Sequence, residues 1–210
     1  MNTTDLDDLP RRKYEDMRNE MRTGDIVFTS GNYPVSRVIR HFSGSLFSHV
    51  GFVFPWNKRV LLVESVEDDG VRAVPLSQYV HDYECCGKPY DGRIFLARHR
   101  RPFSETDAEQ LLGIAADKLN RKYDKEEIGR ILARVTLGIG KPGQNDAYIC
   151  SEFVDVCFQQ IGIRFPRHEK GFIFPEHIAS DPDVDCVCEF DMGPQGPGTR
   201  EIDQNAFYIG

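Results

Sequence analysis

The sequence lacks any long apolar run. None of its apolar stretches approaches the roughly 20 residues that a membrane-spanning helix needs. Residues 1–25 are polar and contain no apolar core of the kind that a signal peptide requires. We therefore expect no transmembrane segment and a chain that is cytoplasmic as synthesised. Work outside the cytosol would then require export by a dedicated secretion apparatus.

An excess of positive charge is also missing. The chain has 26 Lys and Arg against 33 Asp and Glu, which gives a formal net charge of −7. Proteins that bind nucleic acid through its phosphates, or anionic membrane surfaces through basic clusters, show the opposite balance. The sequence therefore disfavours a nucleic-acid partner. Its 40% hydrophobic and 28% charged content is typical of a soluble globular protein.

The six cysteines lack the C-x-x-C spacing of a zinc site. A chain of 210 residues buries enough core to fold without disulfides. We therefore expect reduced cysteines, no metal and no cofactor. The length favours one domain, which we place at 23–190, between a polar N-terminal extension at 1–22 and a Gly/Pro-rich C-terminal tail at 191–210.

Hydrophobic periodicity predicts strands followed by helices, and hence an α+β fold. The alternating segments predicted as strands are 24–29, 48–54, 59–66, 70–76 and 92–99, with a late strand at 185–191. The second and third of these, joined by a short turn, form a hairpin. Helical spacing predicts helices at 104–120, 125–135 and 148–163.

Cys150 follows a Gly-rich segment and stands in the first turn of the last predicted helix. The positive end of a helix favours a thiolate, and its unpaired N–H groups can hold an oxyanion. Cys150 is therefore a candidate nucleophile. The alternative is that it is a core residue on the same apolar stripe as Cys157.

His49 stands at the head of a predicted strand and is a candidate base for a thiol nucleophile. Its alternative role is that of a half-buried histidine without chemistry. Glu64 interrupts an apolar run in the partner strand, where a carboxylate is unfavourable unless it is paired. We expect Glu64 to pair with His49 across the hairpin. The alternative partner is an arginine such as Arg72 on the adjoining strand.

These motifs together resemble the circularly permuted branch of the papain-like NlpC superfamily, which includes YiiX/YaeF-type proteins and, more distantly, lecithin–retinol acyltransferases. The resemblance rests on G-D-I at 24–26, S-H-V-G at 48–51, the strand of Glu64, K-Y-D at 122–124 and Y-x-C-S-E at 148–152. It implies an antiparallel sheet packed against helices, with the histidine before the cysteine in the chain.

The resemblance also implies roles. Cys150 matches the nucleophile, His49 the base and Glu64 the group that orients the base. Tyr123 matches a tyrosine that faces the active site and supports the oxyanion, and Glu152 matches a residue for which we expect a structural role. We therefore predict a cysteine hydrolase that cleaves an amide bond through a thioester, for example in peptidoglycan peptides.

Two other functions compete with this one. A lipid acyl hydrolase or acyltransferase would use the same thioester, and Phe42, Leu46 and Phe47 near the histidine could line an acyl site, although such residues are more often plain core. A non-catalytic binding module is disfavoured, because Cys150, His49 and Glu64 are all present.

Overall fold

The computed structural model describes residues 6–122, 149–169 and 171–193. Within them the chain forms a seven-stranded sheet in the order β1-β7-β6-β2-β3-β4-β5. The strands are β1 (Arg11–Arg12), β2 (Ile26–Gly31), β3 (His49–Trp56), β4 (Arg59–Val66), β5 (Gly70–Pro75), β6 (Gly92–His99) and β7 (Val184–Phe190). The helices are α2 (Tyr14–Met17), α3 (Pro34–Ser43), α4 (Leu76–His81), the 3-10 turn η1 (Tyr83–Cys85), α5 (Glu105–Asp117), α7 (Cys150–Gln159) and α8 (Pro175–Ala179).

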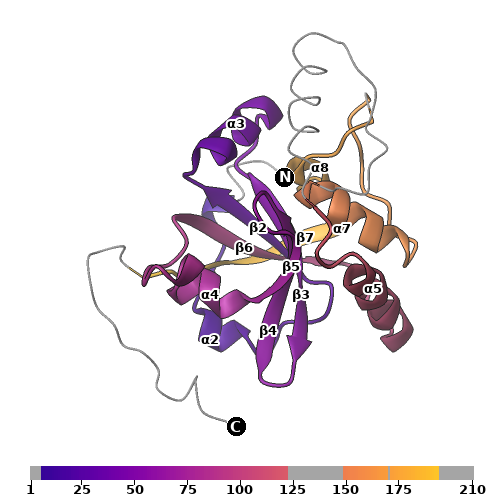
Figure 1. The fold of residues 1–210 in the computed structure, drawn as a ribbon, viewed down its shortest axis with the longest axis horizontal. Coiled ribbons are helices and arrows are strands. Elements are labelled where there is room, and N and C mark those ends of the chain that lie inside the picture. Colours follow the sequence, from indigo (N-terminus) through magenta and orange to yellow (C-terminus); the bar gives the residue numbers. More distant parts are fainter. Residues whose placement is uncertain (1–5, 123–148, 170, 194–210) are drawn as a thin grey trace.

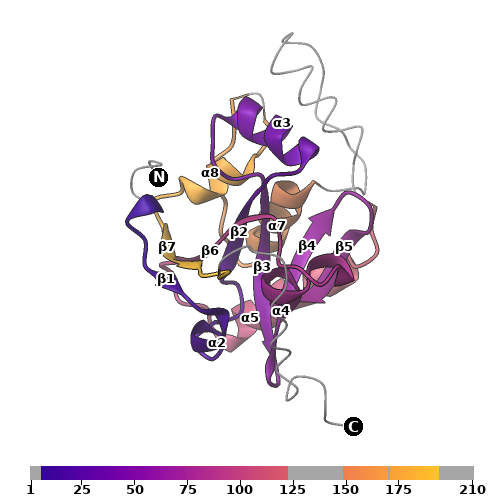
Figure 2. The ribbon, with the colours of Figure 1, turned by 90° about the vertical axis from the view of Figure 1, so that its left-hand side faces the viewer.

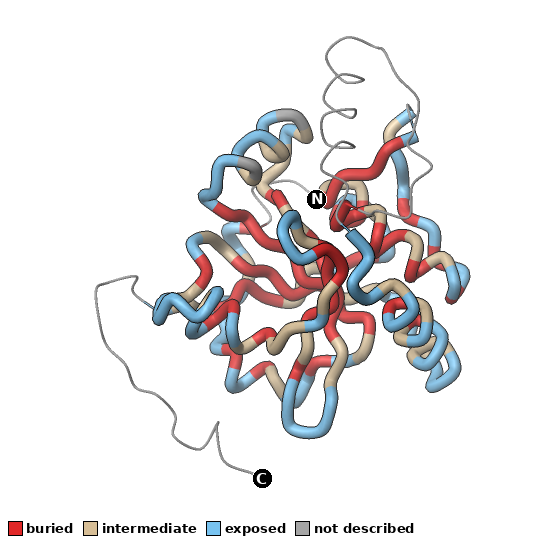
Figure 3. The backbone as a smooth tube through the Cα atoms, in the orientation of Figure 1, coloured by how far each residue is buried: buried red, intermediate tan, exposed pale blue. Residues whose placement is uncertain are grey.

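Helices cover both faces of the sheet (Figure 1). On one face α5, α7 and α8 pack over β2, β3 and β6, around a core that includes Phe28, Phe52, Phe95, Phe153 and Phe158. On the other face α2 and α4 pack around a core that includes Val27, Val53, Leu62, Leu96 and Leu76, and α4 contacts β4 and β5. Figure 3 shows that the buried residues follow the strands and α7.

The hairpin of β3 and β4 is confirmed. Trp56 pairs with Arg59 beside the turn, and Asn57 in that turn has a φ of 53°, which asparagine tolerates better than most residues. Further along, Gly51 pairs with Glu64. Because side chains alternate between faces, His49, Gly51 and Val53 share one face, and Val50 and Phe52 share the other, as predicted.

The predicted strands and two of the predicted helices are confirmed. Helix α5 begins with a capping box, in which Asp107 N donates to Ser104 Oγ and Ser104 N donates to the Asp107 carboxylate. The predicted helix at 125–135 lies outside the described residues. The sequence patterns did not predict α3, α4, α8 or the short strand β1, which pairs in parallel with β7. No helix in the described part of the chain is long and apolar enough to cross a membrane.

Candidate active site

The candidate site lies where β3 begins. His49 is the first residue of β3, and Cys150 is the first residue of α7, which packs against β3 and β4. Figure 2 shows α3 above this end of the sheet. Cys150 lies close enough to His49 to act on the imidazole by charge and hydrogen bonding and to raise its pKa. The fold therefore brings together the candidate nucleophile and the candidate base from opposite halves of the chain.

Glu64 continues this contact on the other side of the imidazole. Its side chain has 0% exposed surface, and its Oε2 lies 2.7 Å from His49 Nε2. Arg72, which pairs with Glu64 across β4 and β5, donates from Nε to Oε1 at 2.9 Å. The structure thus contains both partners that the sequence offered as alternatives for Glu64.

Tyr79 on α4 is a third partner of Glu64. Its hydroxyl lies 2.9 Å from Oε1 and 2.8 Å from Oε2. Burial and the negative charge of Glu64 raise the pKa of Tyr79 well above its usual value, so the phenol keeps its proton and donates a hydrogen bond to the carboxylate. Sequence reasoning missed Tyr79, because the i, i+3, i+4 pattern of Leu76, Tyr79 and Val80 covers one helical turn, which is too short to predict a helix.

The two charged groups of the site stabilise each other. Burial by itself lowers the pKa of His49, but negative charge and hydrogen bonds at Cys150 and Glu64 outweigh it and raise the pKa to about 10. Burial by itself raises the pKa of Glu64, but His49, Arg72 and Tyr79 outweigh it and hold the pKa below the usual 4.5. His49 is therefore held as an imidazolium beside an ionised carboxylate at neutral pH.

Gly51 lets β3 and β4 approach closely beside this pair. A Cβ at this position would lie 2.8 Å from the Val63 carbonyl oxygen and 3.1 Å from Glu64 Cβ. A larger residue would therefore push β4 away from β3 at the level of Glu64. The S-H-V-G motif thus needs glycine at its last position for steric reasons. A glycine inside a strand often marks such a close approach of two backbones.

With this geometry in place, the comparison with known families is decisive: residues 20–196 match the permuted papain-like amidases of the YaeF/YiiX type, family C92. The chain belongs to this family. A crystal structure described as the metalloprotein YiiX from Escherichia coli O157:H7 has the same fold, with a TM-score of 0.61, at 20% sequence identity over 80% of this chain and 96% of that chain. No curated protein sequence matches the chain significantly.

The C92 family membership confirms the α+β, permuted papain-like fold expected from the motifs. The order of the elements agrees with it, since the strand of His49 precedes the helix of Cys150. The matched family is one of amidases, which supports a hydrolase.

A cavity of about 390 Å³ adjoins His49 in this C92 chain. Its walls come from α3, from the loop between β4 and β5, and from α4 and η1. Four tyrosines, Tyr33, Tyr79, Tyr83 and Tyr90, line it together with Glu67, Asp68, Asp69 and Glu84. The cavity lies beside the imidazole, and neither Cys150 nor Glu64 is among the residues that line it.

Other predicted residues fall in different places. Tyr123 lies outside the described residues, and Glu152 is half-buried in the first turn of α7. Phe47 is buried in the core, with ring centroids 4.8 Å from Phe28 and 5.4 Å from Phe95. His41, which the sequence ranked below His49, is exposed on α3.

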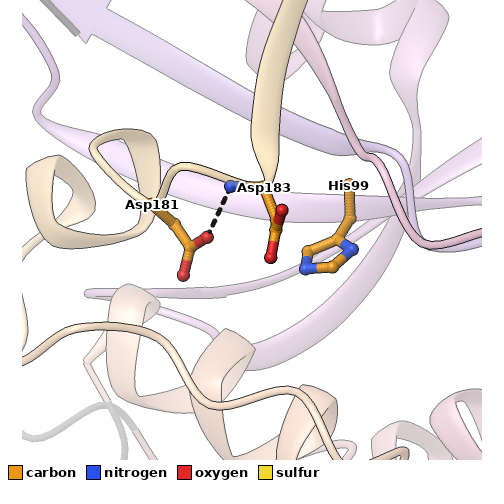
Figure 4. A group of neighbouring side chains, drawn as sticks. All are labelled: His99, Asp181 and Asp183. Atoms are coloured by element: carbon orange, nitrogen blue, oxygen red, sulfur yellow. Dashed lines mark hydrogen bonds between the residues drawn. The ribbon is translucent and has the colours of Figure 1, made fainter.

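One group among the described residues has the composition of a metal site. The side chains of His99, Asp181 and Asp183 place their ligand atoms within 4.8 Å of one another, and the His99 ring turns toward Asp183 (Figure 4). However, His99 Nδ1 accepts the N–H of Arg101 at 3.0 Å. Because a neutral imidazole has one nitrogen lone pair, Nε2 then carries the proton and cannot bind a metal. The group as folded does not fit a metal ion.

Proposed function

We propose that this protein is a cysteine hydrolase in which Cys150 is the nucleophile, His49 the general base and acid, and Glu64 the group that orients His49. The observation that carries the proposal is the position of His49, which is hydrogen-bonded to Glu64 at 2.7 Å and has Cys150 as its other neighbour in the site. Membership of an amidase family supports an amide as the bond that is cleaved.

The geometry supports different roles for the two ring nitrogens of His49. Nε2 is engaged by Glu64, which leaves Nδ1 for the thiol. The carboxylate holds one tautomer and stabilises the charged ring, which in turn favours the thiolate of Cys150. Since Ile149 supplies no side-chain cap, the first N–H groups of α7 are free of a side-chain acceptor from that residue and can hold an oxyanion.

The reaction then runs in two halves. The thiolate adds to the carbonyl carbon of the amide, the C–N bond breaks, and His49 gives its proton to the leaving amine. The acyl group remains on Cys150 as a thioester. Neutral His49 next takes a proton from water, the hydroxide adds to the thioester carbon, and the C–S bond breaks to release a carboxylic acid and the enzyme.

The substrate that we propose is a peptide amide such as those of peptidoglycan. The test is incubation with purified peptidoglycan fragments and, separately, with phospholipids, followed by mass spectrometry. New amine and carboxylate ends in the peptides, absent with Cys150→Ala, would support the proposal. Release or transfer of acyl chains from lipid, with intact peptides, would show the lipid acyl hydrolase or acyltransferase instead.

A further inference from the structure

We propose that Arg72 and Tyr79 are positioning residues that fix the orientation of the Glu64 carboxylate and weaken its attraction for the protonated imidazole of His49. This inference rests on the proposed function, because it assigns a role within the same site. It goes further in making the strength of the base depend on two residues that bind Glu64 and lie outside the sequence motifs of the resemblance.

The first observation is that Glu64 is shared. Its Oε2 faces His49, while its Oε1 accepts from Arg72 Nε at 2.9 Å. Arg72 is itself held on the far side, where its Nη1 donates to Asp69 Oδ2 at 2.5 Å. A single buried anion therefore lies between two cations, and each cation weakens the attraction of Glu64 for the other.

The second observation is the bridging hydroxyl of Tyr79. It reaches both carboxylate oxygens within 2.9 Å, and so it opposes rotation of the carboxylate about its own axis. The ring is fixed by packing, with centroids 4.8 Å from Tyr83 and 5.4 Å from Tyr90. Helix α4 thus acts on His49 through Glu64.

The effect on the base follows from the charges around it. The titratable and charged groups that face His49 and Glu64 are Cys150 on α7, Arg72 on β5, Asp69 before β5, Tyr79 on α4 and Tyr83 on η1, with Tyr90, Glu67, Asp68 and Glu84 around the adjoining cavity. Among these groups, Arg72 and protonated His49 are the two cations. Removing its charge should let Glu64 bind the imidazolium more tightly and raise the pKa of His49.

A purely structural role predicts something different. Glu64 is fully buried, and a buried carboxylate needs hydrogen bonds whether or not it takes part in chemistry. On that reading, loss of Arg72 or Tyr79 would lower stability, but the pH dependence of the remaining activity would stay the same.

The experiment compares Arg72→Gln and Tyr79→Phe with the wild-type chain. The pH profile of kcat/KM and the thermal melt are measured for each, on the substrate identified above. We expect the basic limb of the profile to move to higher pH, by about 0.5–1 unit for Arg72→Gln and by less for Tyr79→Phe. Arg72→Lys restores the cation and should return the limb toward its wild-type position.

Two control variants separate chemistry from stability. Arg98→Gln removes an arginine that binds buried Asp25 through two 2.6 Å contacts on the strand β6. Tyr14→Phe removes the hydroxyl of a buried tyrosine on α2. Both should lower the melting temperature and leave the basic limb in place. A basic limb that stays in place in Arg72→Gln and Tyr79→Phe, or moves to lower pH, would overturn the proposal.

A second measurement does not need turnover. Titration of His49 by NMR in the wild type and in Arg72→Lys and Tyr79→Phe reports the base directly, and these milder variants serve if Arg72→Gln does not fold. An upward shift in Tyr79→Phe, with Arg72→Lys near the wild type, supports the positioning role even where no substrate is cleaved. Absence of any Cys150-dependent turnover would instead contradict the proposed function.

Discussion

His49 Nε2 and Glu64 Oε2 lie 2.7 Å apart, and the two residues belong to adjacent strands of one hairpin. The register that pairs Gly51 with Glu64 places the carboxylate diagonally opposite the histidine on the same face of the sheet. The relative position of His49 and Glu64 is therefore fixed by the hairpin, whereas the thiol of Cys150 is brought to them by the packing of α7.

Replacing the nucleophile should stop the reaction without unfolding the protein. In Cys150→Ala the loss is one buried thiol, so we expect turnover to fall by at least about a thousandfold and the melting temperature to change little. Mass spectrometry of the products and a thermal melt measure the two quantities. Residual turnover within tenfold of the wild type would remove Cys150 from the mechanism.

Cys150 should also be the most reactive thiol. Burial raises the pKa of Cys157 and Cys186 to about 12 and that of Cys188 to about 11, so these thiols stay protonated at neutral pH. Iodoacetamide labelling at pH 6, where an ordinary exposed thiol carries little thiolate, followed by peptide mapping, should find Cys150 first. Preferential labelling of the exposed Cys85 or Cys86 would contradict this.

Glu64→Gln keeps the shape of the side chain but removes its charge. We expect activity to fall by about 10- to 100-fold, less than in Cys150→Ala or His49→Ala, because nucleophile and base remain. The pKa of His49 should fall, so the basic limb of kcat/KM should move to lower pH by about one unit or more. An unchanged pH profile, with lower stability alone, would reduce Glu64 to a partner of Arg72.

The stability that Glu64 supplies should depend on pH in the acidic range. Its pKa in the folded chain is below the usual 4.5, so the unfolded chain takes up the proton first as the pH falls. Its contribution is therefore complete above about pH 4.5 and is lost as the pH falls through the lower, folded value. Thermal melts of the wild type and Glu64→Gln should show a difference at pH 7 that shrinks below pH 4.5. A difference that is constant with pH would contradict the assignment.

Gly51→Ala should impair activity although it removes no functional group. The new Cβ would lie 2.8 Å from the Val63 carbonyl oxygen, so the two strands must separate beside Glu64. We expect lower kcat together with a lower melting temperature. Gly113→Ala is the matched control, because an added Cβ in this exposed position of α5 meets nothing within 4 Å. It should stabilise the protein by about 0.5–1 kcal/mol and leave kcat unchanged.

Much of the sheet was predictable because its strands alternate in a simple way. The alternation placed His49 on one face and Phe52 on the other, as the strand pleat requires, and the register of β3 and β4 adds Glu64 to the face of His49. Helix α5 was predictable from its apolar spacing and its cap at Ser104.

The short helices were not predictable from periodicity. Helix α3 begins at Pro34 and ends before Gly44, which has a φ of 63°, and these two residues are the signals that could have indicated it. Helix α4 follows Pro75 directly, and its one turn of apolar spacing is too short to predict a helix or to point to Tyr79 as a partner of Glu64. The contact of Cys150 with His49 depends on the whole fold, and only the resemblance to a family suggested it.

The order of the elements along the chain has a consequence for the cell that makes this protein. A ribosome completes β3 and β4, and with them the proposed base and its anion, long before it reaches Cys150 at the start of α7. In the proposed mechanism, a chain whose synthesis has not reached Cys150 would have no hydrolytic activity. The permuted order thus delays the reactive thiol until most of the sheet that receives it has been synthesised.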